Sequence, residues 1–142
     1  MTTTWDPESF TRSLIEDMRA HNGQVTSGPM AGKDLMILTT KGAKSGKPRV
    51  AIVTWTRDGD AYVVAGSKGG APTDPQWFEN IRVNPEVTIE AEGSTSKARA
   101  SVAKGADRDK LWERHIARWP EFGEYPKKTD RVIPIARLTR VK

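Results

Sequence analysis

The segment 39–49, TTKGAKSGKPR, concentrates side chains that can bind an anion. It carries four cationic and three hydroxyl side chains together with two glycines. Glycines let backbone N–H groups approach an anion closely, and lysine and arginine add charge-assisted hydrogen bonds to phosphate oxygens. It is not a Walker A loop, because the spacing from Gly42 to Gly46 is one residue short and Pro48 stands where serine or threonine would hold magnesium. The segment predicts a phosphate-binding loop, and an exposed lysine-rich hairpin loop is the alternative that charge alone leaves open.

A second glycine-rich segment, AGSKGGAP at residues 65–72, precedes a predicted helix. Backbone donors at a helix N-terminus favour an anion or a polarised carbonyl group. The segment does not match the GxGxxG fingerprint, and the chain lacks the alternating strands and helices that a dinucleotide-binding fold requires. We therefore treat it as a candidate ligand-binding loop, and a flexible turn that needs small residues is the alternative.

Three aromatic residues, Trp119, Phe122 and Tyr125, follow one another at a spacing of three. Their rings could line a pocket for a flat ligand, although packing in the hydrophobic core is the more common role of such a pattern. We expect Trp55, Trp77 and Trp112 to be core residues for the same reason.

The composition favours an anionic partner. The chain has 142 residues and a net charge of +5, which suits nucleic acid, an acidic membrane surface or a phosphorylated coenzyme. It has no cysteine, and its two histidines, His21 and His115, lie far apart, so we expect no metal site and no Ser–His–Asp triad. No apolar run is long enough to span a bilayer and no signal peptide is visible, so we expect a cytoplasmic protein.

The elements that must position these segments are read from hydrophobic periodicity and turn residues. Apolar residues at helical spacing predict a helix over 7–20, a second helix capped at Thr73 and ended by Asn84-Pro85, and a third over 106–119. Asp58-Gly59 and Gly93 predict hairpin turns. Because of Pro134, we expect the last strand to lie at an edge or to contain a bulge. Strands are predicted over 34–40, 49–56, 61–66, 86–91, 96–103 and 132–138.

Six strands joined mainly by hairpins, with three inserted helices, predict an α+β fold built on an antiparallel sheet or small barrel. At this length we expect a single domain over 1–142, with an N-terminal helix and loop over 1–33 and the barrel core over 34–142.

Three motifs together carry a family likeness. LTTKGAKSGKPRV at 38–50, VVAGSKGGAPTDPQWFENIRVNPEV at 63–87 and TDRVIPI at 129–135 resemble the deazaflavin-dependent nitroreductase family of actinobacteria in order and spacing. The resemblance implies an antiparallel split β-barrel of the FMN-binding split-barrel type. It further implies that the protein binds coenzyme F420, an 8-hydroxy-5-deazaflavin with a phosphodiester and an oligoglutamate tail.

The resemblance also assigns roles to residues. It implies that the first motif grips the phosphate, that the second lies along the deazaflavin ring with the following helix behind it, and that the C-terminal aromatic residues line the acceptor pocket. The corresponding positions are Lys44, Ser45 and Arg49 for the phosphate; Ala65, Ser67, Lys68, Gly69 and Gly70 for the ring; Trp77 and Asn80 in the helix; and Trp119, Phe122 and Tyr125 at the acceptor.

The implied reaction is hydride transfer from reduced coenzyme F420 to a small organic acceptor such as a quinone, an activated C=C bond or a nitro compound. Ser67 or Tyr125 could hydrogen-bond the acceptor or relay the proton, and solvent is an alternative proton donor. The chain lacks the proline that relatives often carry after PRV, and Phe122 lacks the hydroxyl group of nitro-reducing relatives.

Two other functions compete with this interpretation. An FMN-dependent split-barrel oxidoreductase would keep the fold and change the cofactor. A non-enzymatic basic module would bind nucleic acid or another anion through its phosphates. Because the cations cluster beside glycines in ligand-sized loops, we expect a small-molecule acceptor, no nucleic acid and at most peripheral membrane association, and the oligomeric state stays open.

Overall fold

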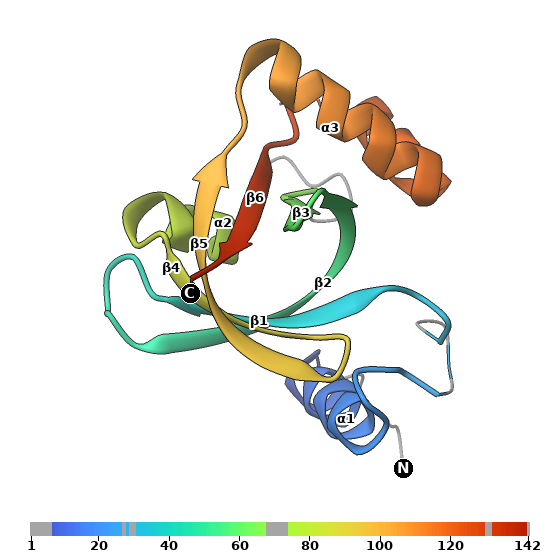
Figure 1. The fold of residues 1–142 in the computed structure, drawn as a ribbon, viewed down its shortest axis with the longest axis vertical. Coiled ribbons are helices and arrows are strands. Elements are labelled where there is room, and N and C mark those ends of the chain that lie inside the picture. Colours follow the sequence, from blue (N-terminus) through green and yellow to red (C-terminus); the bar gives the residue numbers. More distant parts are fainter. Residues whose placement is uncertain (1–6, 27, 29–30, 68–73, 130–131, 142) are drawn as a thin grey trace.

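The computed structural model describes residues 7–26, 28, 31–67, 74–129 and 132–141. Six strands close into an antiparallel barrel in the order β1-β2-β3-β6-β5-β4 (Figure 1). Hairpins join β1 to β2, β2 to β3 and β4 to β5, whereas β1 with β4, β3 with β6 and β5 with β6 are pairings between segments distant in sequence. The strands are β1 (Leu35–Lys41), β2 (Pro48–Asp58), β3 (Ala61–Ala65), β4 (Glu86–Ala91), β5 (Ser94–Val102) and β6 (Ile135–Arg140).

Helices cover different parts of this barrel. Helix α1 (Pro7–Ala20) packs below it in the view of Figure 1, and α3 (Gly105–Arg118) lies at the opposite end, followed by the 3₁₀ helix η2 (Pro120–Lys127). The short helix α2 (Gln76–Val83) lies between β3 and β4 in the chain and packs against β1 and β2. Among the described residues, no helix combines the length and hydropathy needed to cross a bilayer.

The predicted fold class is confirmed. The antiparallel barrel has the predicted six strands, and the helix predicted over 7–20 has those bounds. The other strands and the helix predicted over 106–119 begin or end within a few residues of the observed bounds. Hydrophobic alternation was a sufficient guide because the inward face of each strand packs in one common core.

Two turn predictions need correction. Asp58 ends β2 and pairs with Ala61, so the hairpin between β2 and β3 turns at Gly59 and Asp60. Of these two turn residues, only Gly59 has a positive φ, +60°. The helix predicted to be capped at Thr73 begins at Gln76, with Pro75 as its N-cap and no side-chain cap. Thr73 lies outside the described residues, and Gln76 Nε2 donates to Asn80 Oδ1 instead of reaching back to a cap.

The prediction that the last strand lies at an edge is wrong. Strand β6 pairs with both β3 and β5, because a closed barrel leaves no free edge. Pro134 comes just before the first residue of the strand, so the lack of an N–H group in proline costs the sheet no hydrogen bond. Its carbonyl oxygen accepts a hydrogen bond from Gly66 N at 2.8 Å.

Gly66, at the exit of β3, is confined by its neighbours. A Cβ atom there would lie 2.9 Å from Phe78 Cδ2 and 3.0 Å from Pro134 Cγ, and Phe78 is fully buried. We expect Gly66→Ala to lower the free energy of unfolding by about 1–3 kcal/mol, because a packed core yields little to added volume. Gly123→Ala is the matched control, since a Cβ there meets nothing within 4 Å. Urea denaturation measures both, and equal stabilities would contradict the close packing at Gly66.

Candidate active site

The cationic segment forms the end of β1, the compact loop 42–47 and the start of β2, and this hairpin end is called the cationic loop below. Gly42 N donates to Lys47 O at 2.8 Å, and Gly46 N donates to Gly42 O at 2.9 Å. Ser45 Oγ accepts a hydrogen bond from Lys47 N at 3.2 Å, so this hydroxyl group also shapes the turn. Gly46 has a φ of +70°, which favours glycine. These hydrogen bonds close the loop on itself. It therefore has the hairpin conformation that was expected, and its binding of phosphate stays a prediction.

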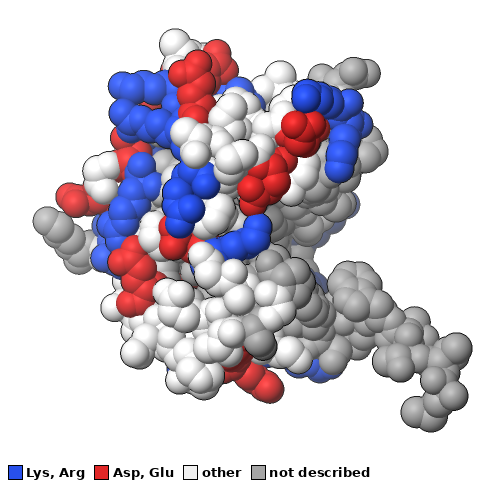
Figure 2. All heavy atoms as spheres, turned by 90° about the vertical axis from the view of Figure 1, so that its right-hand side faces the viewer, with Lys and Arg blue, Asp and Glu red and all other residues white. Residues whose placement is uncertain are grey.

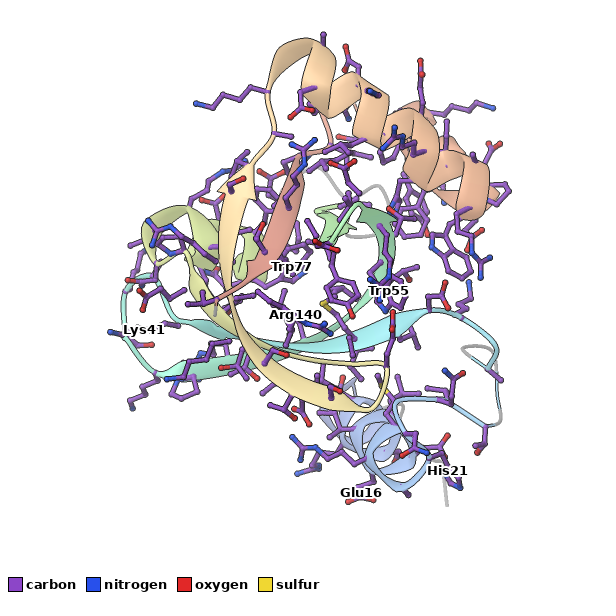
Figure 3. All side chains as sticks on the ribbon, in the orientation of Figure 1. Glu16, His21, Lys41, Trp55, Trp77 and Arg140 are labelled. Atoms are coloured by element: carbon purple, nitrogen blue, oxygen red, sulfur yellow. The ribbon has the colours of Figure 1, made fainter. Side chains whose placement is uncertain are left out.

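The cations of this loop face outward. Lys41, Lys44, Lys47 and Arg49 are exposed, and within the described part of the chain no carboxylate lies within 4.0 Å of their charged atoms. Figure 3 shows Lys41 pointing away from the barrel, whereas Trp55 points into it. On the face seen in Figure 2, lysines and arginines instead lie among aspartates and glutamates. The charge of the loop is therefore available to an anionic ligand.

Asn80 ties this loop to helix α2. Its side chain is fully buried, and Oδ1 accepts hydrogen bonds from Ala43 N at 3.0 Å and from Gln76 Nε2 at 3.1 Å. Its Nδ2 donates to Thr40 Oγ1 at 3.0 Å. Because both ends of the amide are used inside the protein, Asn80 reaches a ligand only through the loop that it holds.

A pocket of about 250 Å³ lies between the start of β2 and the first turn of α2. It brings together three residues predicted at the cofactor, Arg49, Trp77 and Asn80. Trp77 is half-buried and packs against the core, so part of its side chain stays accessible in this pocket. A cation and an aromatic surface in one pocket suit a ligand that has both a phosphate and a flat ring.

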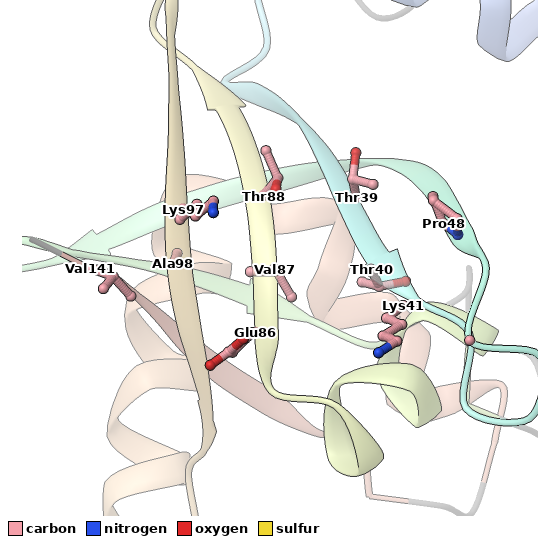
Figure 4. Close-up of a pocket in the computed structure, with 11 residues that line it drawn as sticks. Thr39, Thr40, Lys41, Pro48, Glu86, Val87, Thr88, Lys97, Ala98 and Val141 are labelled. Atoms are coloured by element: carbon pink, nitrogen blue, oxygen red, sulfur yellow. The ribbon is translucent and has the colours of Figure 1, made fainter.

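A larger pocket, about 520 Å³, crosses β1, β4 and β5 and reaches Gly46 of the cationic loop (Figure 4). Lys41 and Pro48 lie toward one end and Val141 at the other. Lys97 and Glu86 add one charge of each sign. This pocket could not be predicted from the sequence, because it depends on the non-local pairing of β1 with β4.

The second glycine-rich segment is described only at its start. Ala65 ends β3 and is buried, and Ser67 is buried too, with a relative exposure of 7%. Lys68, Gly69 and Gly70 lie outside the described residues. Their predicted contact with the ring of the cofactor stays a prediction.

The C-terminal aromatic residues lie in a hydrophobic cluster at the C-terminal end of β3. Trp119 and Phe122 are buried in one cluster with Ala65, and Tyr125 packs half-buried against that cluster. Trp119 Nε1 donates to Trp55 O at 3.1 Å, and the rings of Phe122 and Tyr125 lie 5.1 Å apart. Core packing, the alternative left open for these residues, accounts for Trp119 and Phe122. Tyr125 is the one of the three that combines packing with exposure.

His115 was not among the predicted site residues. It is fully buried in α3, with Nδ1 at 3.2 Å from Thr56 Oγ1 on β2, and its ring meets Phe122 edge to face at 4.6 Å. Its Nε2 atom has no hydrogen-bond partner among the described residues. Burial lowers the pKa of His115 to about 4, against a smaller opposing effect of Glu121, which is itself paired with Lys33. The only signal in the sequence was its place one turn after Leu111, in the apolar stripe of the predicted helix.

This burial predicts a pH-dependent stability. The unfolded chain takes up a proton near the ordinary histidine pKa of about 6.5, whereas the folded protein resists it until about pH 4. Stability is therefore full above pH 6.5 and is lost as the pH falls toward 4, by about 3 kcal/mol in total. Urea denaturation between pH 7 and pH 4.5 measures this loss.

His115→Leu is the control for that titration, and it should flatten the profile over this range. Four carboxyl groups have pKa values that are lowered mainly by hydrogen bonds from neighbouring groups, so they affect the stability below this pH range. They belong to Asp17, Asp58, Asp107 and Glu121. An equally steep profile in His115→Leu would show that another group is responsible.

A family model described as F420H(2)-dependent quinone reductase matches residues 10–140 of the chain. An F420H(2)-dependent quinone reductase of Mycobacterium tuberculosis strain H37Rv is 34% identical over 128 residues, which cover 86% of this chain and 84% of that protein.

Solved structures show the same relationship. One described as an F420-H2 dependent reductase has a TM-score of 0.68 and 32% identity, covering 74% of this chain and 93% of that chain. Another, described as a domain-swapped dimer, has a TM-score of 0.71 and 28% identity over 94% of this chain and 99% of that chain. The residues that the family model matches, 10–140, include the barrel, the cationic loop and the aromatic cluster.

Proposed function

The chain belongs to the F420H(2)-dependent quinone reductase family, and we propose that it transfers a hydride from reduced coenzyme F420 to a quinone-type acceptor. The observation that carries this proposal is the pocket between β2 and α2, where Arg49 and Trp77 lie together beside the exposed cations of the loop. A phosphate and a flat deazaflavin ring match this donor set. The cofactor that the family name implies therefore fits the residues that are present.

We propose that the loop between β1 and β2 anchors the phosphate. Arg49 and Lys44 supply charge-assisted donors, and Ser45 shapes the turn that presents them. Trp77 lies beside Arg49 in the same pocket, where its ring can pack against a planar ligand. When bound, reduced coenzyme F420 supplies the hydride, and the protein's part is to bind and orient both reactants.

The acceptor end is proposed to lie near Tyr125. The aromatic residues Trp119, Phe122 and Tyr125 belong to or pack against the hydrophobic cluster that includes Ala65, where β3 ends and the second glycine-rich segment begins. Reduction of a quinone to a hydroquinone takes one hydride and one proton. Tyr125 is half-buried and can hydrogen-bond the acceptor oxygen, Ser67 is a second candidate, and solvent can supply the proton.

We propose quinones ahead of nitro compounds as acceptors. The names of the matching family and of its mycobacterial member refer to quinones, and Phe122 presents no hydroxyl group beside Tyr125. We further propose a single-domain, cytoplasmic protein whose contact with membranes is at most peripheral.

A binding titration tests the cofactor assignment. Purified protein is titrated with coenzyme F420 and, in parallel, with FMN, and binding is followed by the fluorescence of the protein's tryptophans. We expect saturable binding of F420 at micromolar or lower concentration and much weaker binding of FMN. Preference for FMN would keep the fold and overturn the cofactor. Binding to neither, together with salt-dependent binding to nucleic acid, would support the basic-module alternative.

A further inference from the structure

His115 occupies a position where a histidine is costly. Its ring is fully buried, and Nε2 finds no hydrogen-bond partner among the described residues. A buried polar atom without a partner destabilises a protein, and a leucine would avoid that cost. Burial also keeps the ring neutral, since it lowers the pKa of His115 to about 4. The packing of the core alone therefore gives no reason for an imidazole at this place.

The ring of His115 is fixed on two sides. Nδ1 lies 3.2 Å from Thr56 Oγ1, which belongs to β2 and is itself buried. Trp112, one turn earlier in α3, stacks on the ring at 6.4 Å with an interplanar angle of 16°. A hydrogen bond to the barrel and a stacked neighbour together hold the imidazole plane in one orientation.

That orientation is passed on through two ring contacts. The ring of Phe122 meets His115 edge to face, at 4.6 Å and 78°, and Tyr125 follows Phe122 at 5.1 Å. Edge-to-face pairs depend on the angle between the rings, so a turn of the imidazole would displace Phe122. The contacts thus run from strand β2 through His115 and Phe122 to the half-buried Tyr125.

We propose that His115, oriented by Thr56, is a positioning residue for the acceptor, because it sets the place of Phe122 and Tyr125 at the acceptor site. This inference rests on the proposed function. It concerns the acceptor alone, since Arg49 and Trp77 belong to a separate pocket between β2 and α2.

Thr56→Val tests the inference, because it removes the hydroxyl group and keeps the shape of the side chain. We expect the KM for a 1,4-naphthoquinone to rise about threefold to tenfold, as remote positioning changes do. The dissociation constant of the same quinone, measured by tryptophan fluorescence with oxidised F420 bound, should rise in parallel. The dissociation constant of F420 should stay within about twofold of the wild-type value.

Two further variants separate positioning from a structural role. Thr56→Ser keeps the hydroxyl group, so we expect it to retain the wild-type KM for the quinone. His115→Leu should be as stable as the wild type at pH 7 or more stable, and should still show the raised KM. A protein that gains stability and loses acceptor affinity is not merely misfolded.

The outcomes distinguish this inference from the proposed function. A wild type that neither binds the quinone nor uses it to oxidise reduced F420 would reject both. A wild type that does both, with Thr56→Val equal to it in KM and in quinone affinity, would reject the positioning role alone. A Thr56→Ser variant as impaired as Thr56→Val would also reject it, since the hydroxyl group would then not be the cause.

Discussion

Replacing Arg49 with alanine is expected to weaken the binding of coenzyme F420 about tenfold to a hundredfold. Hydrogen bonds to charged groups contribute about 1.5–3 kcal/mol each, and 1.4 kcal/mol corresponds to a factor of ten in affinity. Arg49 is exposed at the start of β2, and within the described part of the chain no carboxylate competes for it. Its guanidinium group is therefore free to bind a phosphate, and its loss leaves no buried group unpaired.

The folding of Arg49→Ala should be unaffected, which makes the test a clean one. We expect its free energy of unfolding to stay within about 0.5 kcal/mol of the wild-type value, as for most surface substitutions. Lys110→Ala is the charge-matched control, because Lys110 is an exposed cation on α3, at the end of the barrel opposite α1. It should keep the wild-type affinity for F420. An unchanged dissociation constant in Arg49→Ala would rule out this residue as the phosphate anchor.

Asn80→Ala is expected to give the largest loss of stability, about 2–4 kcal/mol. The substitution removes hydrogen bonds to Ala43 N, Gln76 Nε2 and Thr40 Oγ1, and leaves a cavity at a fully buried position. Because Ala43 belongs to the cationic loop, we also expect weaker binding of F420 at a temperature where the variant is folded. Urea denaturation and the fluorescence titration measure the two effects.

The control for this variant is Gln76→Ala. Gln76 is exposed and makes only one of the three contacts, so its loss should cost less than about 1 kcal/mol. Similar stabilities for the two variants would show that the contacts of Asn80 do not hold the loop. A destabilised Asn80→Ala with unchanged affinity for F420 would separate the loop from the cofactor.

The local parts of the fold could be predicted from the sequence. Helix α1 and the two hairpins follow from periodicity and from Gly59 and Gly93, whose positive φ values suit a tight turn. The family resemblance implied a barrel, but the strand pairs that close it could not be predicted from the residues, because the pairing of β3 with β6 depends on contacts between segments far apart in the chain. The error at Pro134 has the same origin, since a strand is an edge only with respect to a known sheet.

The candidate site shows the same division. The exposed cations of the loop follow from composition, because lysines beside glycines are costly to bury. The roles of the buried polar residues, Asn80 and His115, do not follow from the sequence. Each lies in a helix where apolar neighbours predict a core position and nothing about the hydrogen bonds that a polar side chain makes there. Whether Trp119 and Phe122 pack in the core or line a pocket also depended on how η2 folds against the barrel, which spacing alone does not determine.

We propose above that this protein carries a hydride from reduced coenzyme F420 to a quinone. The most direct test mixes the protein and reduced F420 with a 1,4-naphthoquinone in the absence of oxygen and follows the absorbance of oxidised F420. We expect oxidation at a rate proportional to the protein concentration, with one hydroquinone formed for each F420 oxidised, and little turnover when reduced FMN replaces reduced F420. No protein-dependent oxidation of reduced F420 by the quinone, under conditions where F420 is shown to bind, would contradict the claim.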